Sequence, residues 1–265
     1  MFVEDTDAVG RHIVLEDAPR RIVSLVPSQT ELLADLGLED ETVGLTRFCV
    51  HPDGWKQSKA IVGGTKNVDV EKVRALRADL VIANKEENVR EQVEAIAAFA
   101  PVWTTDVATV ADSLIMIRDV GRVTGRVLEA ERIAAEVEAG FSDLEAETRD
   151  LEAVSALYLI WREPWMSVGR DTIIADVLRR GGFASVTDDR DRYPALEDEE
   201  IAALAPDVVL LSSEPYPFAE THIEEVQALV PDAEIRLVDG EPFSWYGSRL
   251  RTTPGALRDL RRRLA

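Results

Sequence analysis

The chain has 265 residues, which is enough for one large domain or for two lobes of roughly 100–130 residues each. It carries 30 Lys and Arg against 50 Asp and Glu, a formal net charge of −20. This balance argues against a nucleic acid as partner and against binding to an anionic membrane surface, because both need a basic surface.

The sequence shows no disulfide, membrane span or export signal. Cys49 is the single cysteine, so no disulfide can form within the chain. No stretch approaches the ~20 apolar residues of a membrane-spanning helix. Residues 1–12 are acidic and lack a basic segment followed by an apolar one, so the chain as written carries no export signal. The compartment therefore stays open.

Residues 1–107 alternate between apolar runs and helical patterns. A short edge strand is expected at 11–15 and a buried strand at 21–26. Ser28 is a candidate N-cap with Glu31 at capping-box spacing. Further strands are expected at 42–46, 80–83 and 102–104, and helices at 28–37, 69–77 and 86–99. This alternation is typical of a parallel sheet flanked by helices, which predicts an N-terminal α/β lobe.

Residues 108–150 differ, because no proline or strand signal interrupts them. Apolar residues recur there at helical spacing. Gly121 and Gly125 weaken the pattern by about 1 kcal/mol each relative to Ala. The segment is predicted to be one long linker helix.

Residues 151–265 return to the alternating pattern and are predicted to form a C-terminal α/β lobe. Strands are expected at 155–161, 184–186, 208–211 and 234–238, and helices at 171–180, 197–205, 221–229 and 254–264.

Two segments 128 positions apart repeat the same pattern of helix, turn with Asp, and apolar strand. The first, DVEKVRALRADLVI, begins at Asp69, and the second, EDEEIAALAPDVVL, begins at Glu197. Glu71 aligns with Glu199, and Asp79 with Asp207. So long a period indicates two similar lobes rather than a stack of small repeats. Clefts between domains are favoured ligand sites, so a ligand is expected between the lobes.

The loops that follow the strands concentrate the aromatic residues, which suit a large, flat, partly apolar ligand. Trp165 and Trp245 stand in loops that contain Pro or Gly and are expected to face the cleft. The alternative for Trp103 and Trp161 is that they pack in the hydrophobic core instead of lining the cleft. His51 could coordinate a metal carried by a ligand, or it could be a hydrogen-bonded loop histidine. No phosphate-binding glycine motif, structural zinc motif or nucleophile elbow occurs.

Glu71 and Glu199 each fall early in a short helix. There a carboxylate complements the helix dipole, which is a sufficient structural reason for its presence. The alternative is that each lobe presents one acid to a partner. A glycosidase pair would need the two carboxyl groups within about 10 Å, which residues on separate lobes do not favour.

The whole pattern from about Arg20 to the end resembles the substrate-binding proteins of ABC importers that carry cobalamin, siderophores or haem. The resemblance is carried by RIVSLVPSQTELL, VGGTKNVDVEKV, PWMSVGRDT and RYPALEDEEI, and it is greatest for the cobalamin-binding members. It implies an α/β fold of two Rossmann-like lobes with parallel sheets joined by one long helix.

The resemblance also implies residue roles. Aromatic and neighbouring loop positions would bind the ligand: His51, Trp165, Tyr193, Trp245, Lys66, Tyr246 and Arg249. Glu71 and Glu199 would dock the permease dimer of the importer. A metal would reach His51 only as part of the ligand. His51 stands where cobalamin binders often have Tyr, and Lys66 and Asn67 replace an aromatic residue that lines the pocket in some members.

We therefore expect a non-enzymatic, monomeric binding protein without an intrinsic cofactor, whose ligand is cobalamin or a related corrinoid. A ferric siderophore or haem is the alternative ligand. The alternative from another class is a cytosolic protein or enzyme that handles a metal or corrinoid. The family is normally periplasmic or extracytoplasmic, but without an export signal a cytoplasmic location stays open.

Overall fold

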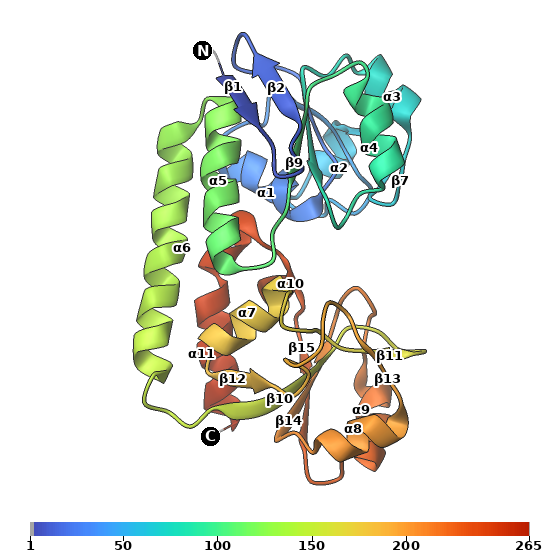
Figure 1. Ribbon diagram of the computed structural model, residues 1–265, viewed down its shortest axis with the longest axis vertical. Coiled ribbons are helices and arrows are strands. Elements are labelled where there is room, and N and C mark those ends of the chain that lie inside the picture. The colour runs from blue at the N-terminus through green and yellow to red at the C-terminus, as the bar shows by residue number, and fades with distance from the viewer. Residues whose placement is uncertain (1–2, 265) are drawn as a thin grey trace. The chain divides into compact units, whose positions relative to one another are not determined.

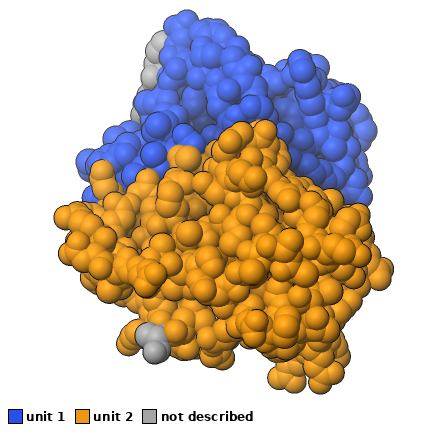
Figure 2. Space-filling model, turned by 60° about the horizontal axis from the view of Figure 1, so that its bottom comes forward, with its two compact units in different colours: residues 1–107, 111–137, 246–249 blue, residues 108–110, 138–245, 250–265 orange. Residues whose placement is uncertain are grey.

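The computed structural model describes residues 3–264 and divides into two compact units (Figures 1 and 2). Unit 1 comprises Met1–Val107, Ala111–Val137 and Tyr246–Arg249, and unit 2 comprises Ala108–Val110, Glu138–Trp245 and Leu250–Ala265. None of the helices within residues 3–264 combines the length and apolar character that crossing a membrane requires.

Unit 1 is built on a five-stranded parallel sheet. Its strand order is β5 (Ala60–Ile61), β4 (Thr42–Leu45), β3 (Ile22–Ser24), β8 (Leu80–Asn84) and β9 (Val102–Thr105). The helices that connect the strands are α1 (Pro27–Asp35), α2 (Trp55–Ser58), α3 (Val70–Ala75) and α4 (Arg90–Ala97). Two small antiparallel pairs complete the unit: β1 (Val3–Thr6) with β2 (His12–Leu15), and β6 (Gly63–Gly64) with β7 (Asn67–Val68). The strands β3, β8 and β9 are buried along their whole length, as their apolar runs predict.

Unit 2 is built on a four-stranded parallel sheet of order β12 (Phe183–Ser185), β10 (Val154–Leu159), β14 (Val208–Ser212) and β15 (Glu234–Val238). A small antiparallel pair joins β11 (Trp165–Met166) to β13 (Ala195–Leu196). The helices are α7 (Ile173–Arg180), α8 (Asp198–Leu204), α9 (Glu220–Leu229), α10 (Glu241–Ser244) and α11 (Thr253–Leu264). A 3₁₀ helix at Gly247–Arg251 begins in unit 1 and ends in unit 2. The predicted α/β fold with two parallel sheets is confirmed.

The two sheets share one topology. The order β4-β3-β8-β9 of unit 1 corresponds to β12-β10-β14-β15 of unit 2. The repeated segments are α3 followed by β8 and α8 followed by β14. The aligned aspartates have the same structural role. Asp79 accepts a hydrogen bond from the backbone N–H of Arg21, and Asp207 accepts one from the backbone N–H of Ser155. Hydrogen bonds from the hydroxyl and from the backbone N–H of Ser155 hold the pKa of Asp207 below its usual value.

The helical segment that precedes unit 2 is not one helix. It consists of α5 (Val110–Thr124) and α6 (Val127–Thr148), which lie side by side in Figure 1. The prediction of a single long helix is wrong here because Gly125 adopts φ +76° and ends α5. The backbone N–H of Arg126 then bonds the carbonyl of Gly121 at 2.7 Å, which is the pattern of a Schellman C-cap. The chain passes from unit 1 into unit 2 within α6.

Gly121 has a packing role that helix propensity does not reveal. A Cβ atom at this position would stand 2.2 Å from Cβ of Ala130 and 3.0 Å from the carbonyl oxygen of Arg126. We expect Gly121→Ala to lower the free energy of unfolding by about 1–3 kcal/mol, because overpacking outweighs the gain in propensity of about 1 kcal/mol. Chemical denaturation measures this, and Gly255→Ala, where a Cβ meets nothing within 4 Å, is the control. A more stable Gly121→Ala protein would contradict the close packing of α5 and α6.

Candidate functional site

The loop after β4 presents apolar side chains to solvent. Cys49 is buried, and its sulfur lies 3.0 Å from the hydroxyl of Thr30 and 3.2 Å from that of Thr46. These contacts fix the position of the loop. Burial raises the pKa of the Cys49 thiol, which favours its neutral, packing form. Its neighbours Phe48 and Val50 are exposed by 53% and 43%. Large exposed apolar side chains on a fixed loop are candidates for ligand contact.

His51 and Arg249, two of the predicted ligand residues, both lie near Glu31 of α1. Arg249 forms a two-pronged ion pair with Glu31, at 2.9 Å from Nε and 2.8 Å from Nη2. Burial raises the pKa of the Glu31 carboxyl, and the charges of Arg249 and His51 oppose that rise. His51 is half-buried. The chain thus brings a carboxylate, a guanidinium and an imidazole together at the carboxyl ends of the strands of unit 1, which is where ligands bind to open parallel sheets.

Lys66 and Tyr246 both bind the loop that follows β8. The Nζ of Lys66 donates to the backbone carbonyl of Glu86 at 2.5 Å. The hydroxyl of Tyr246 donates to the carboxylate of Glu87 at 2.8 Å, and the ring is buried. Burial raises the pKa of Tyr246 well above its usual value, so the phenol stays protonated. The structure therefore brings four of the predicted residues to one edge of unit 1.

In unit 2 the exposed aromatic residue is Trp161, in the loop after β10. Its ring is 40% exposed and meets Tyr216 edge to face, with 5.7 Å between ring centroids. The hydroxyl of Tyr216 is 3.1 Å from Nε2 of His222. Trp161, which the sequence allowed to be core, is thus open to solvent. Its position directly after an apolar strand run is the signal that could have identified it.

Trp165 and Trp245 are both buried, which differs from the open loop positions expected from the sequence. Trp165 is 2% exposed, and its Nε1–H donates to Asp198 at 2.8 Å. Trp245 is 8% exposed, and its Nε1–H donates to Glu214 at 2.7 Å. Burial raises the pKa of Glu214, against the effect of this bond. The reason for the difference is that each indole N–H has a carboxylate partner within unit 2, and the Trp165 ring also belongs to the apolar cluster of that unit.

The remaining predicted residues are Tyr193, a ligand residue, and Glu71 and Glu199, the two docking acids. Tyr193 is half-buried in the loop before β13. Glu71 and Glu199 both occupy the second position of their helices, α3 and α8, and are exposed. Glu71 pairs with Arg74 one turn later at 3.3 Å. Across residues 3–264, no three side chains of His, Cys, Asp or Glu converge as metal ligands would.

Comparison with known proteins agrees with this architecture. A family model described as periplasmic binding protein matches residues 22–232. An ABC transporter substrate-binding lipoprotein, YvrC of Bacillus subtilis, is 26% identical over 77% of this chain and 67% of its own length. A cobalamin-binding protein of Halobacterium salinarum is 26% identical over 78% of this chain but only 58% of its own length. A periplasmic heme-binding protein from Pseudomonas aeruginosa has the same fold, with a TM-score of 0.80 and 23% identity over 91% and 92% of the two chains.

The matched region covers well over half of the chain, including the whole parallel sheet of unit 1 and every strand of the unit 2 sheet except β15. The matched proteins are named as binding proteins or as a transporter's substrate-binding lipoprotein, in agreement with the expectation of a non-enzymatic binding protein. The chain therefore belongs to the periplasmic binding protein family, as the sequence resemblance predicted.

Proposed function

We propose that the chain is the substrate-binding component of an ABC importer and that its ligand is a corrinoid such as cobalamin. Support comes from the family and from relatives named as a transporter substrate-binding lipoprotein and a cobalamin-binding protein. The lipoprotein relative also supports a location outside the cytoplasmic membrane. Haem is the main rival ligand, because solved structures of this fold include heme-binding proteins.

The observation that carries the proposal is the exposure of one large aromatic ring after a central strand of each unit. Phe48 follows β4 and Trp161 follows β10. A corrin or porphyrin ring offers a wide apolar face, and aromatic side chains contribute most of the binding energy at such surfaces. Phe48 and Trp161 are therefore added to those contacts predicted from the sequence whose side chains are at least partly exposed, which are His51, Lys66, Tyr193 and Arg249.

His51 is proposed to approach the metal that such a ligand carries. A neutral imidazole is a common metal ligand, and His51 stands three residues after the exposed Phe48 on the same loop. His51→Ala is expected to change the visible spectrum of the bound ligand. An identical spectrum would remove this role without touching the rest of the proposal.

Titration of the purified protein tests the ligand class. Cyanocobalamin, hemin and ferrichrome are each added, and binding is followed by calorimetry and by visible absorption. Tight binding of cyanocobalamin with weak binding of the other two is the expected result. Preference for hemin would keep the transport role and replace the ligand, whereas no binding of any of the three would contradict the proposal.

Phe48→Ala and Trp161→Ala are each expected to weaken ligand binding by about 2 kcal/mol, since buried aromatic contacts are typical hot spots. Because both rings are already open to solvent in the free protein, neither change should cost much stability. Calorimetry with the preferred ligand measures the loss. Val14→Ala, which removes an exposed apolar side chain from β2, is the control and should bind as the parent does. Unchanged affinity of both aromatic variants would exclude these loops from the site.

Glu71 and Glu199 are proposed to dock the importer's permease. Their equivalent places in two repeated segments give the protein one exposed carboxylate per unit at the same position of the same element. Exposed charges of this kind act by complementing an opposite charge on the partner.

A further inference from the structure

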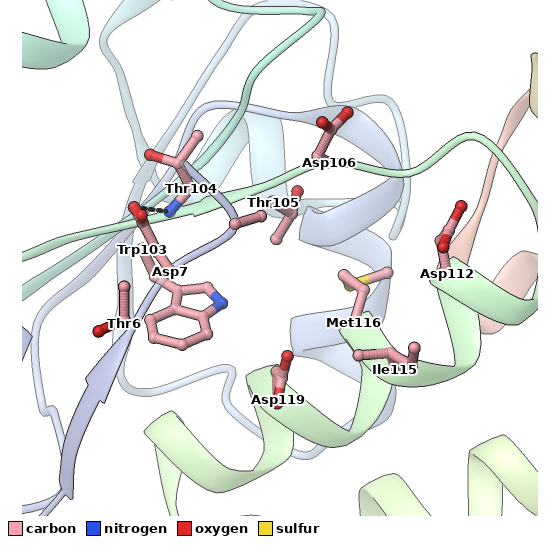
Figure 3. A pocket seen from close by; sticks show the side chains of 11 residues that line it. Thr6, Asp7, Trp103, Thr104, Thr105, Asp106, Asp112, Ile115, Met116 and Asp119 are labelled. Atoms are coloured by element: carbon pink, nitrogen blue, oxygen red, sulfur yellow. Dashed lines mark hydrogen bonds between the residues drawn. The ribbon is translucent and has the colours of Figure 1, made fainter. Parts of the chain in front are cut away.

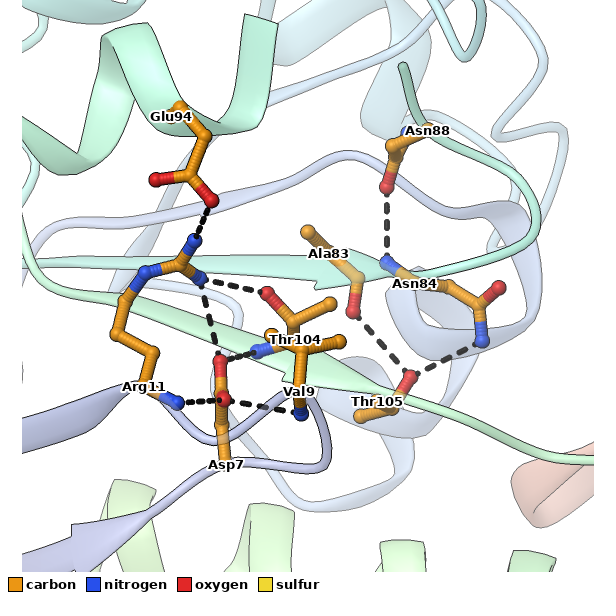
Figure 4. Close-up of polar contacts among 9 residues, drawn as sticks. All are labelled: Asp7, Val9, Arg11, Ala83, Asn84, Asn88, Glu94, Thr104 and Thr105. Carbon is orange, nitrogen blue, oxygen red and sulfur yellow. Dashed lines mark hydrogen bonds and ion pairs between the residues drawn. The ribbon is translucent and has the colours of Figure 1, made fainter. Parts of the chain in front are cut away.

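A pocket of about 220 Å³ in unit 1 lies between β9 and α5 (Figure 3). Three of the aspartates that line it are paired with bases, namely Asp7 with Arg11, Asp106 with Lys85 and Asp119 with Arg122. The Asp7 carboxylate also accepts the backbone N–H groups of Arg11 at 2.7 Å and of Thr104 at 3.0 Å (Figure 4). These carboxylates stabilise the pocket wall and do not require a ligand.

In unit 2, one hydrogen-bonded pair of side chains is informative because its direction can be worked out. Tyr216 lies in the loop after β14, and His222 lies in the first turn of α9. The hydroxyl oxygen of Tyr216 is 3.1 Å from Nε2 of His222. A phenol and an imidazole can each donate, so the direction of the bond depends on which ring nitrogen of His222 carries the proton.

The backbone at the start of α9 decides this tautomer. The N–H of Ala219 donates to Nδ1 of His222 at 3.0 Å. A backbone N–H can only donate, so Nδ1 must offer a lone pair and the neutral ring carries its proton on Nε2. The carbonyl of Ala219 is farther from Nδ1, at 3.2 Å, and already accepts the backbone N–H of His222 at 2.9 Å. A side chain at the third helical position that reaches back to the N-cap N–H is half of a capping box, made here by an imidazole.

The Tyr216 hydroxyl therefore acts as an acceptor towards His222 and keeps its own hydrogen. Because Nε2–H donates to the phenol oxygen, the phenol O–H must find a different acceptor. Across residues 3–264, the hydrogen-bond partner of this hydroxyl is His222 alone. The side chain is half-buried, and tyrosine hydroxyls in such positions usually find a partner. Tyr216 thus offers a hydrogen-bond donor to a molecule outside the chain.

The ring that carries this donor is fixed by its neighbours. Its centroid lies 5.7 Å from that of Trp161, 4.8 Å from that of Phe218 and 5.4 Å from that of His222. The backbone N–H of Tyr216 donates to the carbonyl of Ile160 at 3.3 Å, which joins its loop to the loop after β10. The donor therefore lies in one cluster with Trp161, the exposed ring proposed to contact the ligand, and is held in place before the ligand arrives.

The charges near this cluster favour an uncharged acceptor. The guanidinium of Arg162 binds Glu225 at 3.0 Å from Nε and lies 4.2 Å from the ring centroid of Trp165, so its charge is already engaged. Glu163 is an exposed acid beside it, and Glu220 is another at the start of α9. These carboxylates repel an anionic group, whereas a neutral carbonyl oxygen approaches without such a cost.

We propose that Tyr216 donates a hydrogen bond to an amide carbonyl at the edge of a corrinoid whose face lies on Trp161, and that His222 is the positioning residue that keeps Tyr216 a donor. This contact belongs to the site of the proposed function and rests on that function. Cobalamin carries neutral amide side chains around its corrin ring, whereas haem carries carboxylates at its edge. The contact therefore favours a corrinoid over haem.

Nitrogen-15 nuclear magnetic resonance of the ligand-free protein tests the tautomer independently of any ligand. Protonated and unprotonated imidazole nitrogens have well-separated resonances, and the His222→Gln variant identifies the signals of His222 among the three histidines. In mildly alkaline buffer we expect an unprotonated Nδ1 and a protonated Nε2. A proton on Nδ1 would remove the argument that Tyr216 has a donor available, and would overturn the proposal.

Calorimetry with cyanocobalamin tests the contact itself. Tyr216→Phe keeps the ring and removes the hydroxyl, and is expected to weaken binding about fivefold, as the loss of one neutral hydrogen bond does. Thr221→Ala, which removes an exposed hydroxyl next to His222, is the control and should bind as the parent does. Unchanged affinity of Tyr216→Phe, with tight binding by the parent, would overturn this contact and leave the proposed function in place.

The positioning role of His222 is tested by a double-mutant cycle. Glutamine keeps an acceptor for the N–H of Ala219, as in a usual capping box, but not the imidazole donor that faces Tyr216. His222→Gln should therefore weaken cyanocobalamin binding in the parent and have no further effect in Tyr216→Phe. Equal losses in both backgrounds would show a merely structural role and overturn the assignment of His222. A parent protein that does not bind cyanocobalamin, or that prefers hemin, would overturn the corrinoid contact together with the proposed ligand, and this outcome is seen without any variant.

Discussion

Replacing Trp165 by alanine is expected to lower the free energy of unfolding by about 3–5 kcal/mol, as for other large aromatic residues in cores. The ring is 2% exposed and stacks on Phe218 with 6.3 Å between centroids and 6° between planes. Leu196 and Ile201 belong to the same apolar cluster. Removal of the indole also takes the hydrogen-bond donor from Asp198, so a carboxylate loses its partner at the edge of the core.

Chemical denaturation followed by circular dichroism measures this loss, and Trp161→Ala is the matched control. The two tryptophans stand four residues apart, but Trp161 is 40% exposed, so its removal should cost about 1 kcal/mol or less. The pair of variants thus separates stability from ligand binding: Trp165→Ala should act mainly on the first and Trp161→Ala mainly on the second. A Trp165→Ala protein of unchanged stability that binds ligand weakly would instead support the role predicted from the sequence.

The sequence predicted the architecture of the sheets well because parallel strands have local signals. Residues 80–83 and 208–211 are continuously apolar, and each run follows a short helix whose acidic N-cap, Asp69 or Glu197, can be recognised in the sequence. The aligned Asp79 and Asp207 then have a physical reason to recur, since each holds the start of the first strand of its sheet. Repetition of local signals was therefore enough to predict two similar α/β units.

Burial of the aromatic rings could not be predicted in the same way. Proline and glycine around Trp165 signal that the chain turns, but they do not say which side chain the turn buries. Burial there depends on β13 pairing with β11 across about thirty residues of sequence, with Leu196 opposite Trp165. Likewise, nothing in the local pattern connects Tyr246 to Glu87, which lies 159 positions earlier. Contacts of this kind depend on the assembled fold.

The break between α5 and α6 shows a different limit. Gly125 weakens the helical pattern of the sequence, yet a glycine inside such a pattern is compatible both with a continuous helix and with a C-cap. The close contact of Gly121 with Ala130 requires the helix to end at a C-cap, because the chain must turn back to bring these two residues together. Propensity alone measures only about 1 kcal/mol and cannot distinguish the two outcomes.

Reversing both repeated acids, Glu71→Arg with Glu199→Arg, is expected to abolish transport while ligand affinity stays unchanged. Each residue is an exposed carboxylate at the second position of a short helix, so its loss should cost the fold only about 0.3–1 kcal/mol through the helix dipole. Glu71→Arg also places a like charge one turn from Arg74, at a similar small cost. A docking contact, in contrast, changes from attraction to repulsion, which costs several kcal/mol at an interface.

Uptake of the preferred ligand by cells that contain the cognate importer measures transport, and calorimetry of the purified variant measures affinity. The control is Glu39→Arg with Glu224→Arg, which changes the net charge equally at two exposed positions outside the repeated segments. This control should transport normally, because the −20 charge of the parent makes the overall change minor. If both double variants lose uptake alike, general charge rather than the two repeated acids governs docking. Normal uptake by the Glu71 and Glu199 variant would assign these carboxylates to helix capping alone, for which their place beside the N-terminal N–H groups is sufficient.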